Sequence, residues 1–246
     1  MSALGSTEAM EDLAPPEVSR LVRVLCEPWM WCKRTYLRTK LSRVVTERVL
    51  GREFVVVPGV LNPVIFRAGR YFAEFIAQTP HLARDAGPAH PSALDIGTGS
   101  GILGVFAALR GYSVTAIDIE PGAVACARAN AKRNGVEKQM CVMEGDLFST
   151  VEGEVFDIVV FNLPFFRGVA HTSFERAWRS PDVIERCAAG LSAVLAKGGA
   201  AFFVLSSHGD PKGMLAALSR AGFFVERLTW KHFGVETLAI YSARYI

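Results

Sequence analysis

Short apolar runs alternate with amphipathic segments from residue 92 to the end of the chain. The runs at 93–96, 114–117, 140–144, 156–161 and 200–205 predict buried strands. Between them the pattern predicts helices that begin near Ile102 and near Pro121, and helices over 181–195 and 211–220. Strands that alternate with helices favour a doubly wound α/β sheet, whose ligands bind at the carboxyl ends of the strands.

Glycines mark two of the expected boundaries in this region. The helix over 181–195 is expected to end at Gly198 and Gly199, because glycine commonly follows the last turn of a helix. Gly222 follows the expected helix over 211–220 in the same way. The apolar segments 223–230 and 236–245 then predict a terminal antiparallel pair of strands.

The first 91 residues predict an accessory segment. Residues 1–15 are small, polar and acidic, and predict a flexible lead-in. Apolar spacing over 17–45 favours two helices, because Pro28 interrupts the run. Residues 44–49 and 52–57 predict paired strands around Gly51.

The rest of this accessory segment, which covers residues 16–91 in all, leads into the sheet. Residues 66–77 predict an amphipathic helix, and 80–91 predict a loop rich in proline, glycine and alanine.

Length and composition fit one soluble catalytic domain with an accessory segment. The chain has 246 residues, of which 50% are hydrophobic, so it can bury a sizeable core. It contains no apolar run of membrane-spanning length and no signal-peptide pattern, so we expect a cytoplasmic protein with no membrane partner. Its five cysteines form no CxxC pair, which favours free thiols and predicts no metal site.

Positive charge is concentrated in residues 20–53. This segment holds nine Lys or Arg against three Glu, although the net charge of the whole chain is only +3. Such a segment can bind nucleic acid or an acidic protein surface. The alternative is a solvent-exposed helical face, which is the commoner origin of a charge run.

A glycine-rich turn follows the first predicted strand of the sheet. The sequence from Asp95 to Gly101 is DIGTGSG, and its glycines allow the backbone to turn sharply and approach a ligand before the next helix begins. A nucleoside-type cofactor fits such a corner. The pattern alone is weak evidence, because many ordinary turns are rich in glycine.

Acidic residues follow the next two predicted strands. Asp118 lies about 20 residues beyond the glycine turn, where a carboxylate can accept hydrogen bonds from two ribose hydroxyls. Asp146 and the adjacent Leu147 are placed to bind an adenine amino group and to pack on its ring. The alternatives are that Asp118 caps the helix near Pro121 and that Asp146 belongs to an ordinary turn.

These three strand ends together resemble the S-adenosylmethionine site of class I methyltransferases, and the resemblance covers residues 92–246. It implies a seven-stranded, mostly parallel, Rossmann-like sheet carrying S-adenosylmethionine. The residues that the resemblance assigns to cofactor binding are Asp95, Gly97, Thr98, Gly99, Gly101, Asp118, Ile119, Asp146, Leu147 and Asn162.

Asn162-Leu163-Pro164-Phe165 follows the fourth strand, where methyltransferases acting on amino and amide nitrogens carry an Asn-Pro-Pro-Tyr type signature. The sequence is most similar to the HemK-like release-factor glutamine methyltransferases of the short eukaryotic and archaeal type. The stretches at 174–178 (FERAW) and 234–238 (GVETL) support this resemblance. The sequence departs from the signature at Leu163, which replaces a proline, and at Phe165, which replaces a tyrosine.

The signature implies a way to hold a flat NH2 group. The Asn162 side-chain oxygen and the Leu163 carbonyl can accept its two N–H bonds. Pro164 has a fixed φ and biases Leu163 toward an extended conformation, while Phe165 offers an aromatic face to a planar acceptor. The alternative is that Asn162 caps a turn and that Pro164 merely ends a strand.

The resemblance therefore predicts an enzyme that methylates a planar nitrogen, with a glutamine side chain of a protein as the first expectation. A nucleic-acid adenine or guanine amine, or a small-molecule amine, stays open as the acceptor. An inactive cofactor-binding module is the alternative of another class. Residues 59–63 with Phe66 are expected to border the pocket, and His171 and Arg176 are candidates for its acceptor side.

Overall fold

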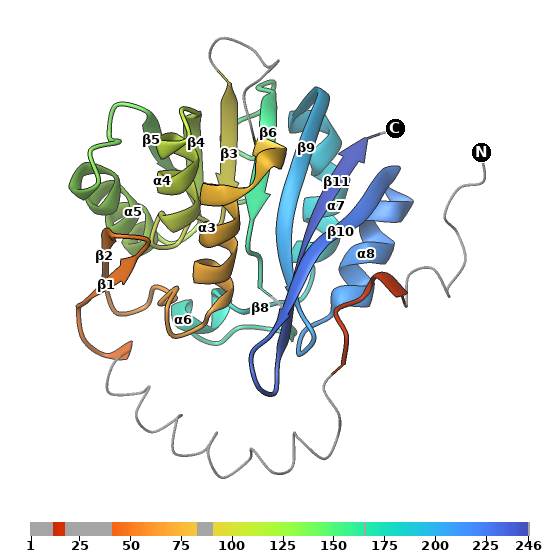
Figure 1. The fold of residues 1–246 in the computed structure, drawn as a ribbon, viewed down its shortest axis with the longest axis horizontal. Coiled ribbons are helices and arrows are strands. Elements are labelled where there is room, and N and C mark those ends of the chain that lie inside the picture. Colours follow the sequence, from red (N-terminus) through yellow and green to blue (C-terminus); the bar gives the residue numbers. More distant parts are fainter. Residues whose placement is uncertain (1–11, 18–40, 83–90, 165, 246) are drawn as a thin grey trace.

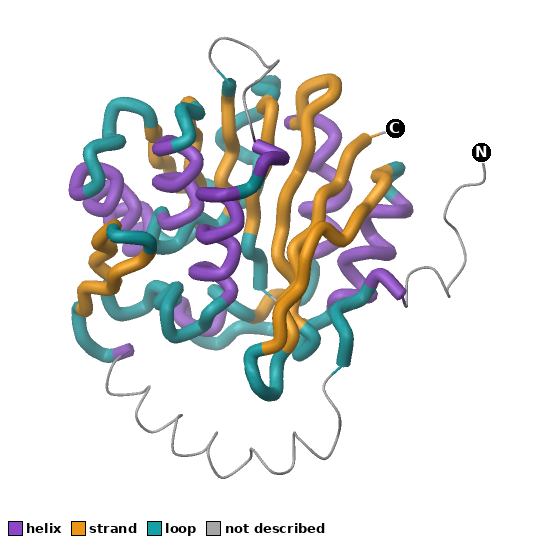
Figure 2. The backbone as a smooth tube through the Cα atoms, in the orientation of Figure 1, coloured by secondary structure: helices purple, strands orange, loops and turns teal. Residues whose placement is uncertain are grey.

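The computed structural model describes residues 12–17, 41–82, 91–164 and 166–245. Its centre is a seven-stranded sheet (Figures 1 and 2). The strands are β3 (Ser92–Ile96), β4 (Ser113–Asp118), β5 (Met140–Glu144), β6 (Phe156–Phe161), β9 (Leu195–Ser206), β10 (Phe223–His232) and β11 (Thr237–Tyr245). Their order across the sheet is β10-β11-β9-β6-β3-β4-β5, and only β11 runs against the others. The expected doubly wound, mostly parallel fold is confirmed.

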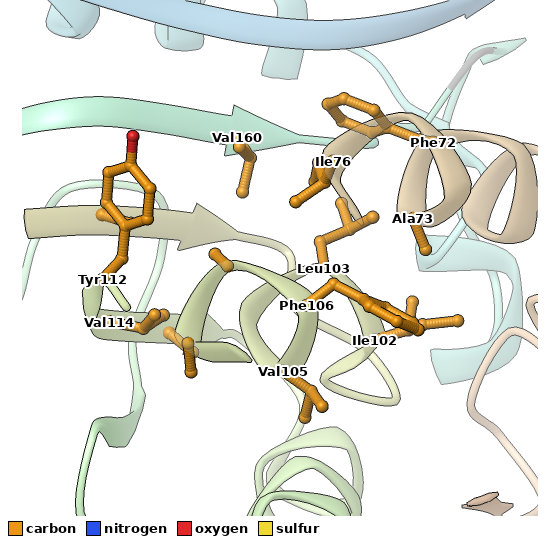
Figure 3. Close-up of a cluster of buried hydrophobic side chains, with 14 of the residues drawn as sticks. Phe72, Ala73, Ile76, Ile102, Leu103, Val105, Phe106, Tyr112, Val114 and Val160 are labelled. Carbon is orange, nitrogen blue, oxygen red and sulfur yellow. The ribbon is translucent and has the colours of Figure 1, made fainter. Parts of the chain in front are cut away.

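Helices cover both faces of the sheet. One face carries α3 (Ala68–Gln78), α4 (Ile102–Leu109) and α5 (Pro121–Arg133), and the other carries α7 (Val183–Val194) and α8 (Pro211–Arg220). The sequence of α4 has no polar side chain, because the helix lies between the sheet and two other helices. Figure 3 shows Phe72 and Ile76 of α3 against Leu103 and Phe106 of α4, all of them buried.

The chain between α7 and the fifth parallel strand differs from the expectation. The helix ends at Val194, and β9 begins at once with Leu195, so Gly198 and Gly199 lie inside a strand rather than after a helix. A Cβ at Gly199 would lie 2.8 Å from the carbonyl oxygen of Asp157. The glycines therefore permit a close approach of β9 to β6, at the place where the pairing register shifts.

The expected N-terminal hairpin is present. Strands β1 (Val45–Val49) and β2 (Arg52–Val56) pair antiparallel through Leu50 and Gly51, which both have positive φ, as a two-residue hairpin turn requires. The two helices expected over 17–45 lie almost entirely outside the described residues. The structure resumes at Leu41, and strand β1 begins four residues later, at Val45.

The helix expected over 66–77 begins two residues later, at Ala68. Asn62 explains the late start: its side-chain oxygen accepts hydrogen bonds from the backbone N–H groups of Val64 and Ile65, and its carbonyl accepts one from Phe66. These bonds hold the chain in a turn ahead of the helix. Most of the expected loop over 80–91 lies outside the described residues, but Pro80–Leu82 forms a short 3-10 helix, η1.

Part of the expected lead-in is held against the sheet. Arg227 of β10 donates hydrogen bonds to the carbonyls of Asp12, Leu13 and Ala14, and the Tyr241 hydroxyl donates to the carbonyl of Leu13. Residues 12–14 are therefore held by hydrogen bonds, in contrast to the flexible lead-in that the sequence predicted. Among the described helices, none is long and apolar enough to cross a membrane.

Three short elements follow β6, and the sequence pattern did not predict them. Strand β7 (Phe166–Arg167) pairs in parallel with β8 (Arg179–Ser180), and the single turn α6 (Ser173–Arg176) lies between them. In Figure 1, α6 and β8 lie at the lower end of the sheet, where the carboxyl ends of the parallel strands meet. This segment forms one wall of the cavity described next.

Candidate functional site

A cavity of about 400 Å³ opens at the carboxyl ends of β3, β4, β5 and β6. This volume lies within the range of sites that hold a small ligand or cofactor. The strand ends contribute residues 96–100, 117–120, 145–147 and 162–164 to its lining. Residues 59–63 with Phe66 form a second wall, and parts of the segment 169–186 form a third.

The glycine turn forms the floor of the cavity. Gly97, Gly99 and Gly101 have φ values of +66°, +55° and +79°, a conformation that L residues rarely adopt. Gly97, Thr98 and Gly99, which the resemblance assigns to cofactor binding, line the cavity. Gly101 does not line it: a Cβ there would lie 3.0 Å from Cα and Cβ of Ala127, so this glycine lets α4 pack against α5.

Asp95 lies beneath the turn rather than in the cavity lining. Its side chain is fully buried, and one carboxylate oxygen accepts hydrogen bonds from the Thr98 hydroxyl at 2.6 Å and the Gly104 N–H at 2.9 Å. The other oxygen, Oδ1, has no hydrogen-bond partner among the described residues. Burial raises the pKa of this carboxyl to about 7, although the two hydrogen bonds act in the opposite direction. Asp95 therefore holds the glycine turn in place from beneath it. This role differs from the direct contact with a cofactor that the resemblance assigns to it.

Asp118 lies at the end of β4 and lines the cavity. Its Oδ2 accepts a hydrogen bond from the N–H of Gly99 at 2.8 Å, and its Oδ1 accepts one from the N–H of Glu120 at 3.0 Å. Burial raises the pKa of Asp118, and the hydrogen bonds partly offset this effect. Each oxygen keeps a lone pair for a further donor, so the carboxylate can still accept from ribose hydroxyls. Asp118 is not the N-cap of α5, whose cap position is Glu120.

Asp146 also lines the cavity, together with Leu147 and Ile119. Its carboxylate is paired with Arg186 of α7, at 2.6 Å from the guanidinium Nη2. The expected acceptor for an adenine amino group thus already holds a cation on one oxygen. The partner could not be inferred from the sequence, because the two residues are 40 positions apart.

The Asn-Leu-Pro turn follows β6 directly and forms part of the cavity wall. Asn162, Leu163 and Pro164 line the cavity, whereas Phe165 lies outside the described residues. Among the described residues, neither the Asn162 side chain nor the Leu163 carbonyl has a hydrogen-bond partner. Two acceptors at the cavity therefore remain available to a ligand.

The second wall of the cavity carries an aromatic side chain, Phe66. Phe66 lines the cavity, and its ring meets that of Trp178 edge to face, with centroids 4.9 Å apart. Within residues 59–63, Asn62 is buried and its amide nitrogen donates to Glu47, so its side chain shapes this wall rather than offering a free polar group. The expected place of this segment at the pocket is confirmed.

The third wall carries three arginines: Arg176, Arg179 and Arg186. Arg176 was a candidate from the sequence, and it forms an ion pair with Glu120 across the cavity at 2.7 Å. His171, the other candidate, is exposed and is not part of the lining. Glu120, Arg179 and Arg186 were missed, because no spacing in the sequence shows that segments 118–120 and 176–186 face one another.

The described residues hold no group of three or more His, Cys, Asp or Glu arranged to bind a metal ion. The site combines the glycine turn, the Asp118 carboxylate and two acceptor groups, at Asn162 and Leu163, that have no hydrogen-bond partner in the part of the chain that the structure describes.

Comparisons with known proteins agree with this geometry. Residues 78–225 match the family described as methyltransferase small domain. The chain is 35% identical over 127 residues to a release factor glutamine methyltransferase of Geobacter sulfurreducens, a match that covers 49% of this chain and 39% of that protein. It is 31% identical over 142 residues to a putative protein N5-glutamine methyltransferase of Methanocaldococcus jannaschii, covering 54% of this chain and 71% of that protein. The chain spans less than half the length of the Geobacter protein.

The fold is also similar to that of solved methyltransferases. A 16S rRNA N2 G1207 methyltransferase of Thermus thermophilus, solved with AdoMet and guanosine, superposes with a TM-score of 0.62 at 21% identity, over 83% of this chain and 50% of that one. The chain belongs to the methyltransferase small domain family, and its fold is that of the class I methyltransferases.

Proposed function

We propose that this enzyme transfers a methyl group to a planar nitrogen, and that the acceptor is the side-chain amide of a glutamine in a protein. The observation that carries the proposal is the turn after β6. There Asn162 and Leu163 line the same cavity as the glycine turn and Asp118, and the Asn162 side chain and the Leu163 carbonyl have no hydrogen-bond partner within the described ranges.

The cofactor half of the cavity fits the chemistry of a nucleoside. A Cβ atom added to Gly97 or Gly99 would lie 3.9 Å or more from the nearest heavy atoms of the protein. Because both residues lack this atom, a ligand in the cavity can approach their backbone. Asp118 supplies acceptors for ribose hydroxyls, and Ile119 and Leu147 supply apolar contacts for a ring. When bound, S-adenosylmethionine supplies an electrophilic methyl group on a sulfonium sulfur.

The acceptor half fits a flat NH2 group. The Asn162 side-chain oxygen and the Leu163 carbonyl would each accept one N–H bond and so orient the nitrogen lone pair. Orientation matters because the reacting atoms must lie about 3 to 3.5 Å apart and in line. Phe66 offers an apolar ring surface at the cavity, and the ring of Trp178 packs against it edge to face. The nitrogen gains a methyl group and loses one proton, which water can accept, so the chain needs no general base there.

The two relatives named for glutamine methylation support a protein acceptor. A second candidate is an exocyclic amine of RNA, because the named structural neighbour acts on a guanine of 16S rRNA. The glutamine proposal is favoured because the stretches at 174–178 and 234–238 resemble those of the HemK-like glutamine methyltransferases, whereas the Asn-Leu-Pro turn fits either kind of nitrogen.

The test is to incubate the enzyme with cofactor carrying a labelled methyl group and with separate pools of proteins including release factors, deproteinised RNA and small metabolites. We expect label in the protein pool, and acid hydrolysis of that pool should release labelled methylamine, the product of a methylated side-chain amide. Label found only in RNA would overturn the glutamine assignment and leave methyl transfer intact. A failure to label any pool would favour a cofactor-binding module without catalysis.

A further inference from the structure

Three arginines line the cavity, and one of them differs from the other two. Arg176 is paired with Glu120 at 2.7 Å, and Arg186 is paired with Asp146 at 2.6 Å. Arg179 has no carboxylate within ion-pair distance among the described residues, although its side chain is exposed at the cavity. The first two arginines are thus paired with carboxylates of the protein itself, whereas Arg179 has no such partner in the described part of the chain.

The strand pairing places Arg179 beside the acceptor turn. Strand β7 follows that turn at once, and its first residue, Phe166, is the direct partner of Arg179 in β8. Backbone hydrogen bonds fix this register: the N–H of Phe166 donates to the carbonyl of Trp178 at 2.9 Å, and the N–H of Gly168 donates to that of Ser180 at 3.3 Å. Arg179 therefore neighbours the place where the acceptor nitrogen is proposed to bind.

The guanidinium is also held in place, with one edge free. Its Nη1 donates to the carbonyl of Arg167 at 3.3 Å, and a Cβ on Gly168, whose φ is +127°, would lie 3.1 Å from this Nη1. The carbonyl is itself fixed, because the Arg167 side chain bonds to Glu185 at 2.7 Å and to Asp210 at 2.8 Å. Nε and Nη2 of Arg179 have no partner among the described residues.

We propose that Arg179 is a specificity-determining residue, and that its free edge binds the carboxylate of an aspartate or glutamate close to the methylated glutamine in the substrate. The inference rests on the proposed function, since it takes the acceptor to be a protein. A guanidinium with two adjacent N–H groups matches a carboxylate in a bidentate arrangement. An acidic neighbour would then help to place the glutamine at Asn162.

The test uses synthetic peptides that contain one glutamine, with aspartate or asparagine at each flanking position in turn. For the wild-type enzyme we expect kcat/KM to be about tenfold higher with aspartate than with asparagine at one or two positions, a difference of about 1.4 kcal/mol, because only the carboxylate forms charge-assisted hydrogen bonds with the guanidinium. In Arg179→Gln the preference should disappear through loss of activity on the aspartate peptide alone. In Arg179→Glu the preferred peptide should instead carry lysine or arginine at that position.

Arg244→Gln serves as the matched control, because Arg244 is exposed in β11 near the end of the chain, outside the cavity lining. It should keep the wild-type preference, and both Arg179 variants should keep wild-type affinity for S-adenosylhomocysteine by calorimetry. Equal kcat/KM for aspartate and asparagine peptides in the wild type, or a preference that survives Arg179→Gln, would overturn the inference and leave glutamine methylation standing. No methylation of any glutamine peptide, with labelling of RNA that falls in Arg179→Gln, would overturn both proposals and indicate a phosphate as the bound anion.

Discussion

Nε of Arg176 lies 2.7 Å from Oε1 of Glu120, and this ion pair joins two sides of the cavity. Glu120 follows Asp118 at the end of β4, whereas Arg176 belongs to the segment that follows the acceptor turn. The side chains of Arg176 and Glu120 are 55% and 24% exposed, so the pair lies at the mouth of the cavity rather than inside it. It connects the acceptor segment to the cofactor side.

We expect this pair to slow the release of a bound cofactor product. Glu120→Arg or Arg176→Glu alone should weaken the affinity for S-adenosylhomocysteine up to about fivefold, because exposed ion pairs contribute at most about 1 kcal/mol. The double variant Glu120→Arg with Arg176→Glu should recover most of the loss. Calorimetry at low and high salt measures this, and the single-variant defects should shrink at high salt. If the double variant is as weak as the sum of the single variants, the ion pair is not the cause.

Asn162→Ala should separate catalysis from cofactor binding. Loss of one acceptor for the NH2 group removes stabilisation that operates mainly as charge develops on the nitrogen, so the rate of methyl transfer should fall by about 10²–10³-fold. Affinity for S-adenosylhomocysteine should stay within about twofold, since Asp118 and the glycine turn are unchanged. Asn162→Asp, which keeps an oxygen acceptor of similar shape, should retain more activity than Asn162→Ala. An alanine variant with near wild-type turnover would show that Asn162 does not contact the acceptor.

The sequence predicts the bounds of several elements of the sheet closely. The bounds of β5 and β6 agree with the expected strands to the residue, because Gly145 and Asn162 follow directly after their mostly apolar segments. Helix α8 agrees as well: Pro211 occupies its first turn, and the Asp210 side chain caps it through the N–H of Gly213. Local signals of this kind need no knowledge of the tertiary structure.

The features of the site that the sequence did not indicate have a common physical cause, since they concern which groups meet in space. Alternation along β3 places Leu94 and Ile96 on the face covered by α7 and α8, and so places Asp95 on the opposite face, under Gly104 of α4. That alternation is visible in the sequence, but the motif resemblance assigned Asp95 to the cofactor. The ion pairs of Arg176 and Arg186 cross between segments far apart in the chain, so no local pattern indicates them.

Gly101→Ala should destabilise the fold without touching the cavity lining. The variant combines a positive φ with a Cβ placed 3.0 Å from backbone and side-chain atoms of Ala127, so we expect a loss of about 2–4 kcal/mol in the free energy of unfolding. Gly122→Ala is the matched control: Gly122 lies in α5, and no heavy atom lies within 4 Å of its notional Cβ. It should change stability by less than about 1 kcal/mol, and in the stabilising direction. Urea unfolding measures both, and equal effects would contradict the packing argument.

The buried carboxyl of Asp95 predicts a pH dependence of stability. Burial raises its pKa from 3.8 to about 7 in the folded protein, so between these values the folded state keeps a proton that the unfolded state has lost. The free energy of unfolding should therefore fall as the pH rises from about 4 to about 7, by an upper limit of about 4 kcal/mol from this group. Asp95→Asn keeps an oxygen that can accept from Thr98 and Gly104 but cannot ionise, so its stability should decline less than that of the wild type between pH 5 and pH 8. Urea unfolding of both proteins at the two pH values measures the difference, and parallel declines would show that Asp95 does not change its ionisation in this range.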